Sequence, residues 1–271
     1  MWLIGVLLFL IILYLYAVMP RISGRPDRTP LYGIYYAHRG LHDNKTDAPE
    51  NSMAAFRKAV EAGYGIELDV QLTKDRIPVV FHDETLKRVC GVEGKVRDFT
   101  YEELQQFTIC KSQERIPLFA DFLKMVDGRV PLIIEIKIHE KAAVVCAAAD
   151  ELIRQYKGIY CIESFDPRAV YWYRKNRPEA IRGQLSSNFN KPGRKELITE
   201  FLVHYLLLNF LARPDFIAYE HTHKKNISRR ICCNLFRALS VAWTIKSQQQ
   251  LDGARDAFEL FIFEGFIPEE K

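Results

Sequence analysis

Short runs of β-forming residues alternate with helical stretches along nearly the whole chain after residue 30. Most of these runs are continuously apolar and rich in Ile, Val and Tyr, which is typical of strands covered on both faces. The predicted strands are residues 33–38, 65–70, 78–82, 132–138, 159–164, 181–185, 216–219, 239–244 and 260–263. The predicted helices are residues 52–62, 118–126, 140–156, 167–175, 195–211, 226–235 and 248–257, with Ser52 as the N-cap of the first.

The link between the second and third predicted strands contains only the residues QLTKDRI, up to Ile77. Because a crossover helix needs a dozen residues or more, these two strands must form a hairpin. A turn centred on residues 74–76 places His82 opposite Leu68, between Glu67 and Asp69. Eight strands then remain for a parallel sheet, and their alternation with helices predicts a TIM-type (β/α)8 barrel over residues 31–271.

The N-terminal run from Trp2 to Met19 carries no charge, and its eighteen residues would make roughly 27 Å of helix. It lacks the basic start and the small-residue cleavage site of a secretory signal. We therefore expect an uncleaved transmembrane anchor at residues 1–20, followed by a linker at residues 21–30. Basic residues next to a membrane span tend to lie on the cytoplasmic side, and Arg21, Arg25 and Arg28 follow this run. We therefore expect a single-pass membrane protein whose folded domain is cytoplasmic. The alternative is that the domain is exported.

The overall composition gives little information about partners. Lys and Arg total 38 against 34 Asp and Glu, and the resulting net charge of +4 is too small and too scattered to indicate a nucleic-acid partner. The six cysteines show no CxxC spacing, which agrees with a reducing compartment. A hydrophobic content of 48% is enough for one large core.

Acidic side chains lie at the ends of two predicted strands, where a barrel of this type carries its working residues. Glu67 and Asp69 are two residues apart in one strand and therefore share a face, and Glu135 ends another strand. Three carboxylates in one barrel mouth would repel each other unless a cation lies among them. Hard oxygen ligands favour Mg²⁺ or Ca²⁺ over Zn²⁺.

Basic and imidazole side chains are expected around this cation. His38 and Arg39 end the first strand, His82 ends the hairpin arm, and Lys137 lies two residues after Glu135. Arg and Lys supply positive charge for a phosphate, and two histidines offer an acid and a base near neutral pH. Together with the cation, these residues indicate phosphodiester chemistry.

The motifs that carry these residues resemble the glycerophosphodiester phosphodiesterase family, in what looks like a membrane-anchored member of the bacterial type. The similarity covers roughly residues 33–265 and rests on HRG, PENS, ELDVQLTKD, VVFHD, EIK, SFDP and AWT, in that order. It implies a TIM barrel and one divalent cation held by Glu67, Asp69 and Glu135. It also implies His38 and His82 as the acid/base pair, and Arg39 and Lys137 as phosphate ligands.

Two positions depart from the family pattern: Lys246 follows WTI where Asn is usual, and the last strand reads FIFEG instead of ending in TD. Both departures concern the leaving-group side of the pocket. Trp243 and Phe165 end strands, where they either line the substrate cleft or pack in the core. The helix at residues 195–211 is apolar enough to pack on two sides or to lie against lipid.

Three functions are compatible with these features. The first is hydrolysis of glycerophosphodiesters to glycerol 3-phosphate and an alcohol at the membrane, by attack of a glycerol hydroxyl or a water on phosphorus. The second is a lysophospholipase D-type activity on lysophospholipids. The third is a lipid-sensing barrel without turnover, which the presence of all three acids and both histidines disfavours.

Overall fold

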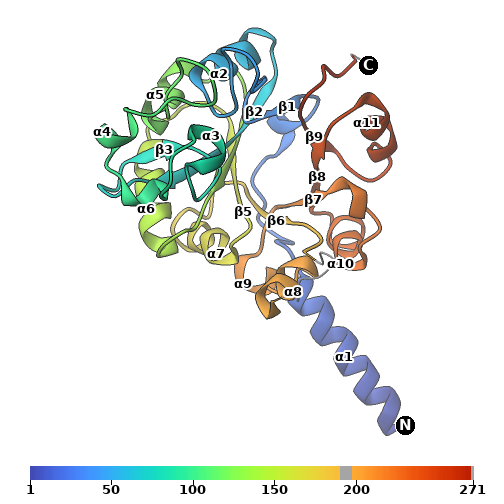
Figure 1. Ribbon diagram of the computed structural model, residues 1–271. Helices are drawn as coiled ribbons and strands as arrows, with labels where there is room; N and C mark the ends of the chain where they lie inside the picture. Colours follow the sequence, from blue (N-terminus) through green and yellow to red (C-terminus); the bar gives the residue numbers. More distant parts are fainter. Residues whose placement is uncertain (190–196, 270–271) are drawn as a thin grey trace.

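The computed structural model describes residues 1–189 and 197–269 of the chain (Figure 1). Within these ranges one nine-stranded sheet closes on itself, because β1 pairs with both β2 and β9. All neighbouring strands run parallel except β3, which pairs antiparallel with β2. The strands are β1 (Tyr35–His38), β2 (Gly65–Leu72), β3 (Pro78–Val80), β4 (Leu132–Ile136), β5 (Tyr160–Ser164), β6 (Arg182–Ser186), β7 (Phe216–Glu220), β8 (Leu239–Ile245) and β9 (Leu260–Phe263).

Helices cover the outside of this barrel and lie mostly between consecutive strands (Figure 1). The longer ones are α1 (Trp2–Val18), α2 (Met53–Glu61), α5 (Phe119–Val126), α6 (Ala142–Ile153), α7 (Pro167–Asn176), α8 (Ile198–His204) and α11 (Gln248–Ala254). The shorter ones are η1 (Thr29–Leu31), α3 (Lys87–Cys90), η2 (Val96–Asp98), α4 (Tyr101–Leu104), α9 (Asn209–Ala212), η3 (His221–His223), α10 (Ile227–Arg230) and the π-helical turn η4 (Ile231–Leu235). The predicted barrel of eight parallel strands is confirmed.

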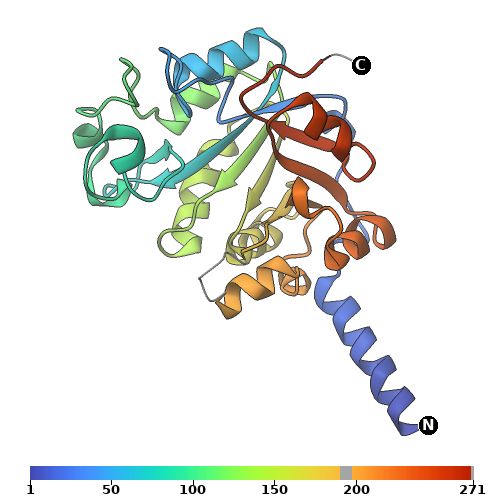
Figure 2. The same ribbon diagram turned by 45° about the vertical axis from the view of Figure 1, so that its right-hand side comes forward.

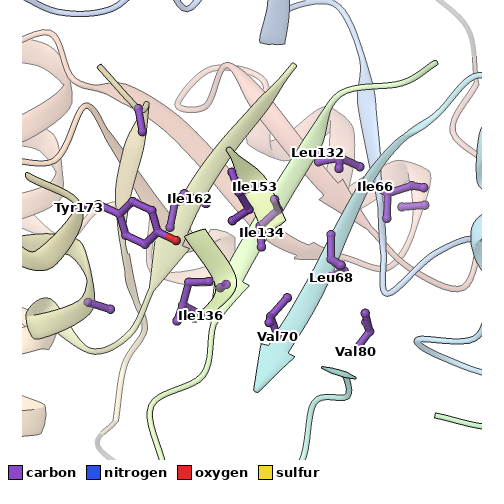
Figure 3. Close-up of a cluster of buried hydrophobic side chains, with 14 of the residues drawn as sticks. Ile66, Leu68, Val70, Val80, Leu132, Ile134, Ile136, Ile153, Ile162 and Tyr173 are labelled. Carbon is purple, nitrogen blue, oxygen red and sulfur yellow. The ribbon is translucent and has the colours of Figure 1, made fainter. Parts of the chain in front are cut away.

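The two faces of each strand pack against different partners. In β2, Ile66, Leu68 and Val70 point outward and join the cluster that includes Ile153 of α6 and Tyr173 of α7 (Figure 3). Because side chains alternate along a strand, the residues between them point into the barrel. The interior contains a second apolar cluster, to which Leu31, Tyr36, Ile133, Cys161, Phe216 and Leu239 belong. Acidic residues in β2 and β4 therefore have to lie inside the barrel.

The hairpin between β2 and β3 has the predicted register. Val70 lies opposite Val80, and Leu72 lies opposite Pro78. The pairing continues past the end of β3, where the Phe81 amide donates to the Asp69 carbonyl at 3.0 Å. This hairpin brings His82 to the carboxyl end of β2.

The segment between β3 and α5 forms a subdomain that the sequence patterns did not predict. It contains α3, η2 and α4 and has its own core of eight buried side chains. These side chains are Val79, Phe81, Leu86, Val89, Val96, Leu104, Ile109 and Ile116. Its elements are too short to show clear helical periodicity, since α3 and α4 have four residues each.

The long apolar helix predicted at residues 195–211 is wrong as a single helix; residues 195–196 lie outside the described residues. Two helices, α8 and α9, occupy the rest, and Leu206 between them has a left-handed φ of 56°. Leu206 is buried, as are Val203 and Asn209 on either side of it. The apolar stripe of one helix could not bury three consecutive leucines. The break between α8 and α9 lets this link pack on the barrel instead.

Helix α1 leaves the base of the barrel and extends away from it (Figures 1 and 2). It has 17 residues, about 26 Å, and its C-terminal end packs on the domain. The Tyr14 hydroxyl lies 2.8 Å from Ser228 Oγ, and Val18 is fully buried. None of the helices in residues 1–189 and 197–269 has both the length and the apolar character needed to cross a membrane.

The predicted transmembrane anchor at residues 1–20, and with it a single-pass membrane protein with a cytoplasmic catalytic domain, is therefore wrong. Part of the apolar run is used for packing on the domain. The three arginines that suggested an orientation are bound to the barrel. Arg21 donates to the Pro178 carbonyl, Arg25 to the carbonyls of Phe236 and Arg237, and Arg28 to that of Asp215.

Candidate active site

Three buried carboxylates meet at the carboxyl end of the barrel. Glu67 and Asp69 come from β2, and Glu135 comes from β4, where it lies directly beside Asp69 in the parallel register. One oxygen from each of the three lies within 4.8 Å of the others. All three residues are almost completely inaccessible to solvent. The three acids predicted from the sequence thus share one location.

Two cations lie against this acidic triad. Lys137 Nζ is 2.8 Å from Glu135 Oε2 and 3.0 Å from Asp69 Oδ1, and Arg39 Nε is 3.5 Å from Asp69 Oδ2. Burial, together with the charges of Asp69 and Glu135, raises the pKa of Glu67 well above its ordinary value. Burial also acts on Asp69, but Lys137 and the other neighbouring cations hold the pKa of that carboxyl well below its ordinary value. Burial and the neighbouring acids thus disfavour the ionised form of Glu67, and a cation bound among the three carboxylates would stabilise that form.

A tight turn after β1 places Arg39 beside the acids. Arg39 and Gly40 both have left-handed backbone angles, with φ of 55° and 82°. A Cβ at position 40 would come within 2.9 Å of the Ala55 backbone, so only glycine fits the close approach to α2. The turn directs the Arg39 amide to Glu67, with distances of 2.9 Å to its carbonyl oxygen and 3.2 Å to Oε2.

Each of the two predicted histidines has a carboxylate at the same ring nitrogen. His38 Nδ1 lies 2.6 Å from Glu264 Oε2, and His82 Nδ1 lies 2.7 Å from Asp83 Oδ1. A proton on Nδ1 satisfies the carboxylate and leaves Nε2 available in the neutral ring. Burial lowers the pKa of His38 to about 4, although Glu264 opposes this shift, so His38 is neutral at pH 7.

Both histidines line a cavity of about 370 Å³ together with Arg39, Glu67, Glu135 and Trp243. Lys137 contacts the acids at its edge and lines the adjacent cavity. Phe165 borders both cavities, and its ring packs edge-on against Trp243 with the centroids 5.5 Å apart. Trp243 and Phe165 also pack on the apolar cluster inside the barrel. Each of them therefore both lines a cavity and packs in the core, which were the two alternatives given from the sequence.

Several polar residues near the site were not assigned a role in it from the sequence, although Glu50 lies in a loop where the sequence allows either a substrate contact or helix-start chemistry. Glu50 accepts from Arg39 Nη1 at 2.7 Å and from both terminal nitrogens of Arg88 at 2.7 and 2.8 Å. Asn51 donates to Asp69 Oδ2 at 2.9 Å. Glu163 of β5 lies beside Glu135 in register and also lines the cavity of about 370 Å³. Only the PENS motif, which contains Glu50 and Asn51, gave a signal for any of these residues.

Residues 38–212 match the model of the Glycerophosphoryl diester phosphodiesterase family. The chain belongs to this family. As a member of the glycerophosphoryl diester phosphodiesterase family, the protein is an enzyme, a phosphoric diester hydrolase. The family resemblance inferred from the motifs is thereby confirmed.

Relatives and solved structures agree with the family assignment. YhdW of Bacillus subtilis (strain 168) is 30% identical to this chain over 227 residues, which are 79% of this chain and 86% of YhdW. YhdW is itself named a glycerophosphodiester phosphodiesterase only provisionally. The glycerophosphodiester phosphodiesterase of Caldanaerobacter subterraneus is 41% identical over 131 residues, 46% of this chain and 52% of that one.

Two solved structures show the same fold. A phosphodiesterase of Oleispira antarctica, solved with the product sn-glycerol-3-phosphate, superposes with a TM-score of 0.69 at 22% identity, over 86% of this chain and 93% of that one. The glycerophosphodiester phosphodiesterase of Thermotoga maritima gives a TM-score of 0.66 at 24% identity, over 86% and 95%. At these identities the likeness concerns the fold alone.

Proposed function

We propose that the protein hydrolyses glycerophosphodiesters to glycerol 3-phosphate and an alcohol, and that it uses one divalent cation, Mg²⁺ or Ca²⁺, for this reaction. The cation would be held by Glu67, Asp69 and Glu135. His38 and His82 would transfer protons, and Arg39 and Lys137 would bind the phosphate. Trp243 and Phe165 would line the substrate cleft.

One observation carries this proposal: a buried acidic triad shares a cavity rim with two histidines whose Nδ1 atoms are both tied to carboxylates. A structural ion-pair cluster would explain the acids with Arg39 and Lys137. It would not explain why two imidazoles line the same cavity, each held at Nδ1 so that Nε2 can accept or donate a proton. Acid/base chemistry requires this arrangement.

The residues present fit a divalent cation of the hard type. Three carboxylate oxygens within 4.8 Å of each other can bind one ion, and no cysteine or histidine belongs to this group. When bound, such an ion supplies positive charge to the phosphoryl oxygens and makes the attacking hydroxyl more acidic. The family typically binds a divalent metal.

The side chains of the site can account for the proton transfers. One imidazole takes the proton of the attacking hydroxyl or water while the new P–O bond forms. The other imidazole gives a proton to the oxygen of the departing alcohol as the old P–O bond breaks. Where a glycerol hydroxyl attacks, the product of this step is a cyclic phosphodiester, and water then opens it to glycerol 3-phosphate with the two imidazoles in exchanged roles, so that protons balance over one turnover. Arg39 and Lys137 place fixed positive charge where negative charge develops on the phosphoryl oxygens.

The test is hydrolysis of sn-glycero-3-phosphocholine by the purified full chain, with both products quantified. We expect glycerol 3-phosphate and choline in equal amounts, loss of activity with EDTA, and recovery with added Mg²⁺ or Ca²⁺. Release of glycerol and phosphocholine would show that the other ester bond is cleaved and would contradict the proposal. Full activity after complete removal of divalent ions would contradict the role of the acids.

A further inference from the structure

A second cavity, of about 930 Å³, adjoins the catalytic cavity on the side of α8. The two cavities share His82, Glu135 and Phe165 in their walls, so they adjoin each other beside the acidic triad. Its wall is mostly apolar and includes Ile136, Ile138, Phe165, Phe189, Val203 and Leu208. Charged residues such as Asp166, Arg168 and Glu200 surround this wall.

Aromatic rings connect the two cavities. Trp243 lines the catalytic cavity, Phe165 lines both, and Phe189 lines the larger one. The ring centroid of Phe165 lies 5.5 Å from that of Trp243 and 6.0 Å from that of Phe189. In both pairs the rings meet edge to face. A row of three rings in contact therefore leads from the wall of the catalytic cavity to the wall of the larger cavity.

A water-soluble glycerophosphodiester such as glycerophosphocholine has no apolar part to place in this cavity. Apolar surface that stays open to water beside a catalytic site is unfavourable unless a ligand covers it. The catalytic cavity, at about 370 Å³, is of the size that holds a small ligand by itself. The larger cavity thus implies a substrate with an additional apolar group.

We propose that the larger cavity binds a single alkyl or acyl chain, and that the preferred substrates are phosphodiesters that carry one such chain. This proposal rests on the proposed phosphodiesterase function. If a methylene is taken to be about the size of a water molecule, at roughly 30 Å³, a sixteen-carbon chain needs on the order of 500 Å³ and two such chains on the order of 1,000 Å³. At about 930 Å³ the cavity accommodates one chain with its linking groups, whereas two chains alone would already fill it.

The chain can be attached on either side of the phosphate, and the assay separates the two cases. Lysophosphatidylcholines carry the chain on the glycerol, whereas glycerophospho-N-acylethanolamines carry it on the departing alcohol. We compare octanoyl and decanoyl members of both series with glycerophosphocholine, at concentrations where all are monomeric. Burial of each additional methylene raises kcat/KM by up to about fourfold. The decanoyl member of the accepted series has two more methylenes than the octanoyl member, so its kcat/KM should be about tenfold higher.

Phe189→Ala tests the cavity wall, and Phe201→Ala is the matched control. Phe201 lies on α8, is 45% exposed, and is not among the described residues that line the cavity. We expect Phe189→Ala to lower kcat/KM for the decanoyl substrate at least fivefold and to leave turnover of glycerophosphocholine unchanged. Phe201→Ala should change neither.

Binding of dodecylphosphocholine below its micelle concentration, measured by calorimetry, gives a readout that does not depend on turnover. Chain-dependent binding that Phe189→Ala weakens, without turnover of any substrate, would support the cavity and refute the proposed function. Turnover of glycerophosphocholine with no preference for chain-bearing substrates would overturn the cavity proposal alone. Equal effects of the two Phe→Ala variants would overturn it as well, and preference for a diacyl phosphodiester would refute the single chain.

Discussion

His38 Nδ1 lies 2.6 Å from Glu264 Oε2, although the two residues are 226 positions apart in the chain. The closure of the barrel produces this contact, because β1 pairs with β9 and Glu264 directly follows β9. His82 has the equivalent partner in the next residue, Asp83. Glu264 is also one of the positions where the chain departs from the family pattern, and the other, Lys246, lies 3.7 Å from it.

Glu264→Gln tests whether this carboxylate positions His38. The amide keeps the size of the side chain but removes the charge that holds the proton on Nδ1. We expect kcat to fall by about 10–100-fold with little change in KM, as for other residues that orient a functional histidine. Glu61→Gln is the control, since Glu61 is exposed at the end of α2 and is not among the described residues that line the catalytic cavity, and its kcat should stay within about threefold. A Glu264→Gln enzyme with normal kcat would refute the positioning role.

His82→Ala tests the proposed acid/base role at the hairpin. Removal of a proton-transferring imidazole should lower kcat by about 10²–10⁴-fold while thermal unfolding stays that of the wild type. Added imidazole should restore part of the activity. His221→Ala serves as the control, because His221 lies in η3 and is not among the described residues that line the catalytic cavity. Near-normal turnover in His82→Ala with unchanged metal dependence would exclude this role.

The contact of Glu50 with Arg88 and Arg39 predicts a pH-dependent contribution to stability. Burial opposes ionisation of Glu50, but Arg88 and Arg39 together hold the pKa of this carboxyl at about 2, against an ordinary value of 4.5. Because the pKa is lower in the folded state, the contribution is complete above pH 4.5 and is lost as the pH falls to about 2.

Glu50→Gln should therefore lower the free energy of unfolding by about 1–3 kcal/mol at pH 7. The difference from the wild type should decrease below pH 4.5 and nearly vanish at about pH 2. Urea unfolding at several pH values measures it. A difference that does not change with pH would show that the ionised carboxylate is not what stabilises this contact.

Much of the fold follows from local sequence patterns. Each of the nine predicted strands corresponds to an observed one, and the short link after β2 determined the hairpin and its register. Local patterns were insufficient where tertiary packing decides the structure. The break at Leu206 and the packing of Val18 on the domain depend on surfaces that the chain creates only when it folds.

The candidate site shows the same division. The acids and histidines were identified because they end strands of a predicted barrel. Their partners were missed because barrel closure or loop geometry brings them in: Glu264 comes from the far end of the chain, and Arg88 comes from the subdomain after β3. Asp83 and Glu264 do follow strand ends, which is the one sequence signal that could have indicated them.

Glu163 provides a matched control for the cation site. It lies beside Glu135 in the next strand and is equally buried, but it is not one of the three acids whose oxygens converge. Burial and the charge of Glu135 raise the pKa of Glu163 well above its ordinary value. Glu163→Gln should leave binding of a divalent cation within about threefold of the wild type, since Glu163 does not belong to the group of acids that would hold the ion.

Calorimetric titration of the purified full chain with Mg²⁺ and with Ca²⁺ tests the central claim most directly. The account predicts one bound ion per chain, loss of this binding in Asp69→Asn and Glu135→Gln, and its retention in Glu163→Gln. Absence of binding in the wild type, or the same binding in Asp69→Asn, would contradict the proposal that the buried acids form a metal site.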